Sequence, residues 1–185
     1  MEVKKTSFKD LIICNPSVYK DERGYFFESY NESLFQELTG LSPQFVQDNQ
    51  SRSSYGVLRG LHFQVGDNAQ AKLVRVLEGE VLDIVVDLRI NEPTFGQSFS
   101  IVLSAQNGTQ LFVPKGFAHG FLVLSDHATF FYKCDNYYNK ESERGLKYDD
   151  PALEINWQLD AQDLLLSEKD QNNLSFEAVK QLLSV

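Results

Sequence analysis

Short apolar and alternating runs, separated by turn residues, make up most of the chain. Such runs are typical of β-strands rather than of long amphipathic helices. Turns are expected at Glu78-Gly79, Asn91-Glu92-Pro93, Asn107-Gly108 and Lys115-Gly116. The strands predicted on this basis are Leu11–Cys14, Phe45–Asn49, Val57–Gln64, Lys72–Leu77, Val81–Arg89, Gln97–Leu103, Leu111–Val113, Phe121–Leu124 and Thr129–Asp135. Many short strands without long helices between them favour a mainly β fold: a sandwich, jelly roll or barrel.

Two short helices complete the prediction. The first begins after Asn31, whose side chain can cap it, and ends at Gly40, and the second follows Ser175. Their apolar faces are expected to be Leu34, Phe35 and Leu38 in the first helix and, facing the barrel, Phe176, Val179, Leu182 and Leu183 in the second. Since no internal repeat or linker is apparent, residues 1–185 are predicted to form a single domain. Its β core lies at roughly residues 45–135, with N-terminal strands and a C-terminal helical segment packed on it.

Alternation within the strands predicts which side chains share a cavity. Lys72 lies on the same face as Val74 and Val76, at the end of a row that points inward. A lysine at this position could bind an anion at the mouth of a barrel, or it could be an ordinary surface lysine at a strand edge. Tyr132 shares its face with Phe130, and a buried tyrosine hydroxyl requires a hydrogen-bond partner.

One pair of basic residues conflicts with strict alternation. Arg59 and His62 fall on opposite faces of a regular strand, so both can reach one ligand only if the strand bends. Gly60 lies between them, where a bulge is easiest. The sequence therefore predicts an irregularity at Gly60, and regular pairing through residues 58 to 63 would contradict it.

The chain has three histidines, and histidine is the side chain best suited to act as a base near neutral pH. His127 lies in an expected exposed turn, which leaves His62 and His119 in strand-like runs. A single strand histidine is more often a hydrogen-bonded core residue than a catalytic one. Two of them favour a ligand pocket when they are taken with basic residues in comparable contexts, namely Arg23, Arg59 and Lys72.

Composition narrows the classes of function. The net charge of −9 argues against a nucleic-acid partner, but a few arginines can still hold a small diphosphate. Cys14 and Cys134 form no CxxC motif, so neither a redox motif nor a zinc site is indicated, and reduced thiols are expected. No secretory signal and no apolar run near the ~20 residues of a membrane span are apparent. A soluble cytoplasmic protein without a membrane partner is expected.

Taken in order, the motifs of this chain resemble those of the dTDP-4-dehydrorhamnose 3,5-epimerase family, nucleotide-sugar epimerases with a cupin-type jelly-roll fold. The matching stretches cover nearly the whole chain. They are Asp21–Phe26, Phe45–Asn49, Gly56–His62, Lys72–Val76, Val86–Arg89, Pro93–Gly96, Pro114–Phe121, Tyr132-Lys133, Tyr137-Tyr138, Glu143–Gly145 and Leu166–Asp170. Departures are mild: Phe63 replaces a more usual tyrosine, and Lys115 stands where glutamate is frequent.

The resemblance implies a reaction and roles for five side chains. A base removes the proton beside a C4 ketone, an enolate forms, and an acid returns a proton on the opposite face. By match to the family, His62 is the base and Asp170 its orienting partner. Tyr132 is the opposing acid, and Lys72 faces the C4 oxyanion with help from His119. The implied substrate is dTDP-4-dehydro-6-deoxyglucose, and no cofactor or metal is expected.

The resemblance also implies how the dTDP group is held. Arg23 and Arg59 pair with the diphosphate, while Phe26 and Tyr138 stack on thymine. The other implied binding residues are Glu28, Gln47, Asn49, Glu143 and Lys169. In the family, residues near Arg23 come from the neighbouring subunit, which implies a homodimer with shared active sites.

Three other functions are weighed against this one. A related enzyme could invert C3 only or C5 only, or shift the ketone, with a similar barrel. A metal-binding cupin is disfavoured because His62-Phe63-Gln64 and a lone His119 are a poor ligand set for a transition metal. A non-catalytic sugar-binding barrel would have no use for opposed His62 and Tyr132.

Overall fold

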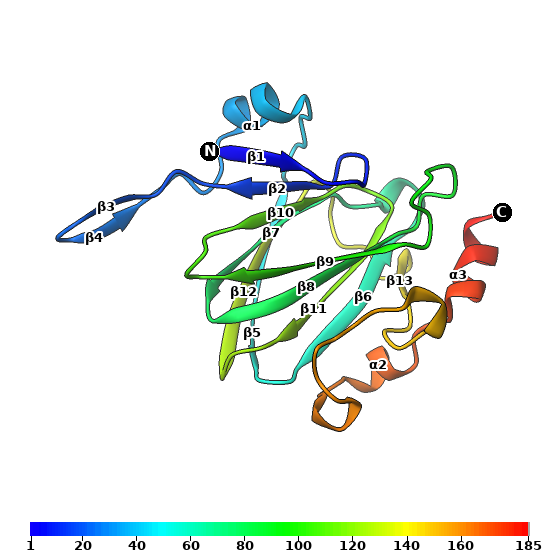
Figure 1. The fold of residues 1–185 in the computed structure, drawn as a ribbon. Coiled ribbons are helices and arrows are strands. Elements are labelled where there is room, and N and C mark those ends of the chain that lie inside the picture. Colours follow the sequence, from blue (N-terminus) through cyan, green and yellow to red (C-terminus); the bar gives the residue numbers. More distant parts are fainter. Residues whose placement is uncertain (185) are drawn as a thin grey trace.

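The computed structural model describes residues 1–184, which form two facing antiparallel sheets with short helices around them (Figure 1). One sheet has six strands, in the order β1 (Glu2–Lys5), β2 (Ile12–Asn15), β10 (Gln110–Val113), β7 (Lys72–Glu78), β12 (His127–Cys134) and β5 (Gln47–Ser54). The other has five, in the order β13 (Glu143–Gly145), β6 (Leu58–Gln64), β11 (Phe117–Val123), β8 (Glu80–Asp87) and β9 (Ser98–Ser104). From β5 onward the chain passes repeatedly from one sheet to the other, as in a jelly roll. The prediction of a mainly β jelly roll is confirmed.

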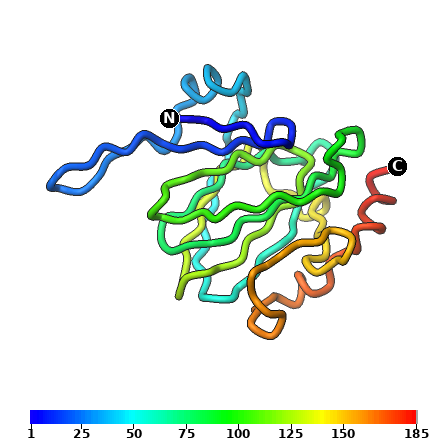
Figure 2. Tube along the Cα trace, viewed as in Figure 1, coloured from blue at the N-terminus to red at the C-terminus, as the bar shows by residue number. Residues whose placement is uncertain are grey.

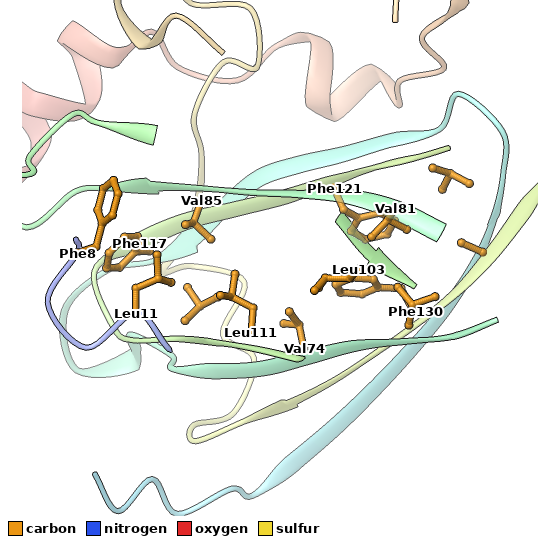
Figure 3. Close-up of a cluster of buried hydrophobic side chains, with 14 residues drawn as sticks. Phe8, Leu11, Val74, Val81, Val85, Leu103, Leu111, Phe117, Phe121 and Phe130 are labelled. Carbon is orange, nitrogen blue, oxygen red and sulfur yellow. The ribbon is translucent and has the colours of Figure 1, made fainter. Parts of the chain in front are cut away.

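Apolar side chains from both sheets fill the space between them (Figure 3). Phe121 of β11 stacks on Phe130 of β12 with ring centroids 4.2 Å apart, joining the two sheets. Each such fully buried side chain contributes about 1.5–3 kcal/mol relative to exposure. The layer contains Phe8, Leu11, Val74, Val76, Val81, Val85, Leu103, Leu111, Val113, Phe117, Phe121, Val123, Ala128 and Phe130.

The five-stranded sheet is buried on its outer face as well. Leu82 and Ile84 of β8 point away from the inter-sheet layer and pack under Trp157 and Val179 of the C-terminal segment. That segment, drawn in orange and red in Figure 1, lies along this sheet. Every residue of β11 is consequently buried, so the C-terminal segment is part of the wall that positions the site.

Both predicted helices are present. In α1 (Glu32–Thr39) the Asn31 side chain accepts a hydrogen bond from Leu34 N at 3.1 Å, and Gly40 ends the helix with φ 76°. The C-terminal helix α3 (Phe176–Leu183) is capped by Ser175. Leu182 is the exception to its expected apolar face: it is 37% exposed, because the helix buries only Val179 fully.

Several elements differ from the predictions. The strand expected at Phe45–Asn49 runs from Gln47 to Ser54, and Phe45 instead packs beside the cluster that α1 covers. Polar residues fill β5 because one face meets solvent, so apolar alternation does not mark it. His127 begins β12 rather than lying in a turn. The unpredicted elements are β1, β3 (Tyr19–Asp21), β4 (Gly24–Phe26), β13, α2 (Glu168–Gln171) and the 3-10 turns Gly66–Asn68, Pro151–Leu153 and Ala161–Asp163.

The β3–β4 hairpin projects from the body of the chain (Figure 2). Its aromatic side chains are exposed, with Tyr25 at 68% and Phe26 at 66%. Large apolar side chains this exposed are typical of an interaction surface rather than of a free loop. In the described residues, 1–184, no helix is long and apolar enough to cross a membrane.

The predicted irregularity at Gly60 is confirmed. In the β6–β11 pairing His62 lies opposite His119, but Arg59 lies opposite Phe121, so the stretch from Arg59 to His62 has one residue more than its partner. Gly60 has φ 118°, and the Gly60–Leu61 peptide bond is cis. A Cβ at Gly60 would lie 2.7 Å from Gly120 Cα. Only glycine fits both this backbone and this contact.

We predict that Gly60→Ala strongly destabilises the fold. The new methyl group must displace the β11 backbone and the residue must hold a disfavoured φ, which together should cost about 3 kcal/mol or more. The melting temperature should therefore fall by roughly 6–12 °C. Gly66→Ala is the matched control, since Gly66 also has positive φ but no atom within 4 Å of an added Cβ. Equal shifts for the two variants would contradict this account of the bulge.

Candidate active site

A cavity of about 540 Å³ opens between the two sheets. Its walls bring together side chains from β6, β7, β11 and β12 and from the segment that leads into α2. Seven of the residues predicted for the site line it: Arg59, His62, Lys72, His119, Tyr132, Lys169 and Asp170. The bulge at Gly60 is what allows Arg59 and His62 to face this one cavity.

His62 is held by a buried carboxylate. Its Nε2 lies 2.6 Å from Asp170 Oδ1, and the Asp170 side chain is 5% exposed. Asp170 is carried by the four-residue helix α2, whose N-cap Ser167 donates from Oγ to Asp170 Oδ2 at 2.8 Å. Burial raises the pKa of Asp170, but the hydrogen bonds from His62 and Ser167 outweigh it, so the net pKa lies below the usual value. An ionised Asp170 accepts from Nε2 and leaves Nδ1 as the basic nitrogen of His62.

Lys72 and Tyr132 lie on the facing sheet. The Lys72 ammonium is 5.7 Å from the centre of the Tyr132 ring. Within residues 1–184 no carboxylate forms an ion pair with Lys72, and burial lowers its pKa. Burial likewise raises the pKa of Tyr132, which keeps the phenol protonated. The wall opposite the histidine therefore has a protonated phenol and a lysine without a carboxylate partner in residues 1–184.

His119 forms a second histidine–carboxylate pair. Its Nε2 lies 2.9 Å from Asp83 Oδ2, and Asp83 is fully buried. The other Asp83 oxygen has no hydrogen-bond partner among the described residues. Asp83 was not predicted as a site residue, although an acid inside an apolar strand is a signal that could have found it.

Four further predicted residues form the rim: Glu143, Tyr138, Gln47 and Asn49. Glu143 Oε2 accepts from Lys169 Nζ at 2.6 Å and from the Tyr138 hydroxyl at 2.8 Å. Beside them, Gln47 Oε1 accepts from Tyr138 N at 3.0 Å, and Gln47 donates to Asn49 at 3.0 Å. Asn49 in turn donates to Cys134 Sγ at 3.6 Å. The rim is thus one connected polar network.

Three predicted residues lie away from the cavity of their own chain. Arg23 and Phe26 are on the projecting hairpin, where Arg23 pairs with Asp21. Glu28 lies near the start of α1 and accepts from Asn31 at 3.3 Å. Sequence reasoning also missed the apolar wall and the serines of the cavity, which are Ser51, Val57, Leu58, Phe121, Phe130, Leu165, Leu166 and Ser167. In the part of the chain that is described, no three His, Cys, Asp or Glu side chains gather as a metal-binding group.

A jelly-roll cavity with a histidine–carboxylate pair on one wall and a tyrosine and a lysine on the other defines a cupin-type acid–base enzyme. Comparison with known proteins agrees with this class. The family model described as dTDP-4-dehydrorhamnose 3,5-epimerase matches residues 5–178. A relative of that name from Shigella flexneri is 51% identical over 176 residues, covering 95% of this chain and 96% of the relative. The chain belongs to the dTDP-4-dehydrorhamnose 3,5-epimerase family.

Solved structures agree with the fold. The dTDP-4-dehydrorhamnose 3,5-epimerase from Elizabethkingia anophelis has a TM-score of 0.93 and 58% identity, covering 96% of this chain and 97% of that one. A dTDP-6-deoxy-D-glucose-3,5-epimerase from Legionella pneumophila, solved with dTDP-4-keto-L-rhamnose, has a TM-score of 0.93 and 48% identity. It covers 98% of this chain, and 96% of its own chain is matched.

We predict that Lys72→Met stabilises the fold at neutral pH. Because burial lowers the pKa of Lys72 from 10.5 in the folded chain, the folded state loses its proton at lower pH than the unfolded state does. The wild-type free energy of unfolding should therefore rise with pH between the two pKa values, and the variant should lack this rise. Urea unfolding at pH 7 and at about pH 9.5 measures both effects.

Lys147→Met is the control for the loss of a lysine, since Lys147 pairs with Asp149 at the surface. It should keep the wild-type dependence on pH. A Lys72→Met protein that is less stable at pH 7 and keeps the wild-type slope would contradict the cost assigned to the buried ammonium.

Proposed function

We propose that the chain epimerises both C3 and C5 of dTDP-4-dehydro-6-deoxy-D-glucose, giving dTDP-4-dehydro-L-rhamnose for dTDP-L-rhamnose biosynthesis. One observation carries the proposal: His62, backed by Asp170, and Tyr132 line the same cavity from facing sheets. Inversion at carbon needs a base on one face of the sugar and an acid on the other. The match of the family model to most of the chain supports the choice of substrate.

His62 starts the reaction. The C4 ketone acidifies the hydrogens at C3 and C5, and His62 Nδ1 takes one of them while Nε2 remains bonded to Asp170. The Asp170 carboxylate stabilises the imidazolium that forms and fixes its tautomer. A positioned base of this kind typically contributes about 10²–10⁴-fold to the rate.

Lys72 and Tyr132 complete the reaction. The Lys72 ammonium, which lacks a carboxylate partner among residues 1–184, stabilises the enolate oxygen at C4 together with His119. A preorganised oxyanion donor is worth roughly 3–4 kcal/mol in the transition state. Tyr132 then protonates the carbon from the opposite face, which inverts its configuration. The same cycle repeats at the second carbon.

NMR of the substrate in D₂O tests the proposal. Deuterium should enter at both C3 and C5 with no added cofactor, and His62→Ala should lose this exchange by about 10²-fold or more. His127→Ala should exchange like the wild type, because His127 pairs with Glu78 at the start of β12, outside the cavity.

Other results of this experiment would identify one of the alternative functions instead. Exchange at one carbon only would make the protein a C3-only or C5-only epimerase or a ketoisomerase. Loss of exchange on chelation would favour a metal-binding cupin. Tight binding with no exchange would make it a sugar-binding barrel and overturn the proposal.

The active site is shared between two subunits of a homodimer. The hairpin carries Arg23 and Phe26 away from their own cavity, with Phe26 66% exposed. Inserted into a partner's cavity, Arg23 would join Arg59 on the diphosphate and Phe26 would face Tyr138 across thymine. Glu28, at the base of the same arm, would reach the partner's nucleotide as well.

Subunit mixing tests this arrangement. Arg23→Ala and His62→Ala homodimers should each be weakly active, because every site lacks one essential group. Mixed heterodimers contain one intact site, so a 1:1 mixture refolded together should recover about a quarter of the wild-type activity. Recovery no greater than the sum of the two variants would contradict the exchange of arms between subunits.

The location that suits this function is the cytoplasm, where nucleotide sugars are made for cell-surface polysaccharide. Both cysteines are free and buried, and burial raises the pKa of Cys14 to about 12. Buried protonated thiols are inert, as expected in a reducing compartment.

A further inference from the structure

The acid at the cavity rim, Glu143, has one cationic partner among the described residues, which is Lys169. Glu143 accepts from both Lys169 and the Tyr138 hydroxyl. Its own side chain is only 16% exposed, whereas the Lys169 side chain is 55% exposed. A long exposed lysine reorients at little cost, while a buried carboxylate is held by its surroundings. Lys169 is therefore the member of the pair that can leave.

Glu143 lies where its charge acts on His62 without touching it. In the β13–β6 pairing Glu143 is opposite Gln64, and His62 is two residues from Gln64 on the same face. Such diagonal neighbours lie about 7–8 Å apart. At that separation in a partly buried site, an uncompensated carboxylate favours the protonated imidazole. Burial raises the pKa of Glu143, but the bonds from Lys169 and Tyr138, with the charge of His62, bring it below the usual value.

The other two carboxylates near His62 are already bonded to neighbouring side chains. Asp170 on α2 is bonded to His62 and to Ser167, and Asp83 on β8 is bonded to His119 on β11. The remaining charged or titratable groups that line the cavity are Arg59 on β6, Lys72 on β7 and Tyr132 on β12. Of the three cations Arg59, Lys72 and Lys169, only Lys169 is held by a carboxylate in residues 1–184. A diphosphate entering the cavity competes for that lysine.

We infer that Lys169 leaves Glu143 for the diphosphate when nucleotide binds, and that the released Glu143 carboxylate makes His62 a stronger base only in the occupied site. The inference rests on the proposed function for the nucleotide. Glu143 and Lys169 act through His62, so both are positioning residues. The consequence is that the base reaches full strength only when the ketone it must deprotonate is present.

Titration of His62 by NMR, with dTDP as the probe, tests the inference. With only three histidines in the chain, the ring signals of full-length protein labelled at histidine can be separated, and His62→Gln assigns the relevant one. In the wild type, dTDP should raise the midpoint of the His62 titration by about one pH unit. Part of that rise is the direct effect of the diphosphate charge. Variants of Lys169 and Glu143 measure the part that is due to the released Glu143 carboxylate.

Lys169→Met and Glu143→Gln should each reduce the rise by about half a pH unit. In Lys169→Met the nucleotide-free midpoint should already be raised, because Glu143 is then uncompensated; in Glu143→Gln it should not. Lys147→Met, with its surface pair, should behave like the wild type. Equal rises in all four proteins would overturn the inference while leaving the proposed function intact. Failure of dTDP to bind the wild type would overturn both.

Discussion

The close contact between Gly60 and Gly120 is the constraint on which the active site depends. Two glycines face each other across β6 and β11, and a Cβ on either would lie under 3 Å from the opposite backbone. This close contact accommodates a bulge, in which β6 has one residue more than β11 between Arg59 and His62. The bulge turns both of these side chains toward one cavity. Without it, pleating would send one of the two basic side chains to the far face of the sheet. A local backbone feature thus sets the chemistry of the cavity.

The C-terminal segment connects stability to catalysis. It covers the outer face of the five-stranded sheet with Leu153, Trp157 and Val179. The same segment then delivers Asp170 to His62. The chain cannot lose this covering layer without also losing the partner of its proposed base. Opposite them, the half-buried Lys72 is predicted to lower stability when it is charged, a cost that fits a site built to receive an anion.

The sequence predicted the parts of this structure that local patterns determine. Alternation placed Val74, Val76 and Phe130 in the inter-sheet layer, and the capping residues Asn31 and Ser175 marked two helices. The conflict between Arg59 and His62 was enough to predict the irregularity at Gly60. Residue types and alternation singled out five of the predicted side chains that line the cavity, and the family resemblance added Lys169 and Asp170.

The rest depends on contacts between distant segments. Strand β5 is polar and α2 has only four residues, so neither carries a periodic pattern. The pairing of Asp83 with His119, and of Glu143 with Lys169, joins residues that lie far apart in the chain. Among residues 1–184 the Arg23 side chain pairs only with Asp21, and the role proposed for Arg23 lies in a second subunit.

The central claim is that a base and an acid on facing sheets share each inversion. The most direct test measures the rates of deuterium exchange and of inversion when the Tyr132→Phe variant acts on dTDP-4-dehydro-6-deoxyglucose in D₂O. With His62 intact and the opposing acid removed, the account predicts that deuterium still enters the sugar, but on the face from which the proton was removed. The rate of exchange should therefore exceed the rate of inversion by about 10²-fold or more. If inversion and exchange fall together, or if inversion persists at the wild-type rate, Tyr132 is not the opposing acid.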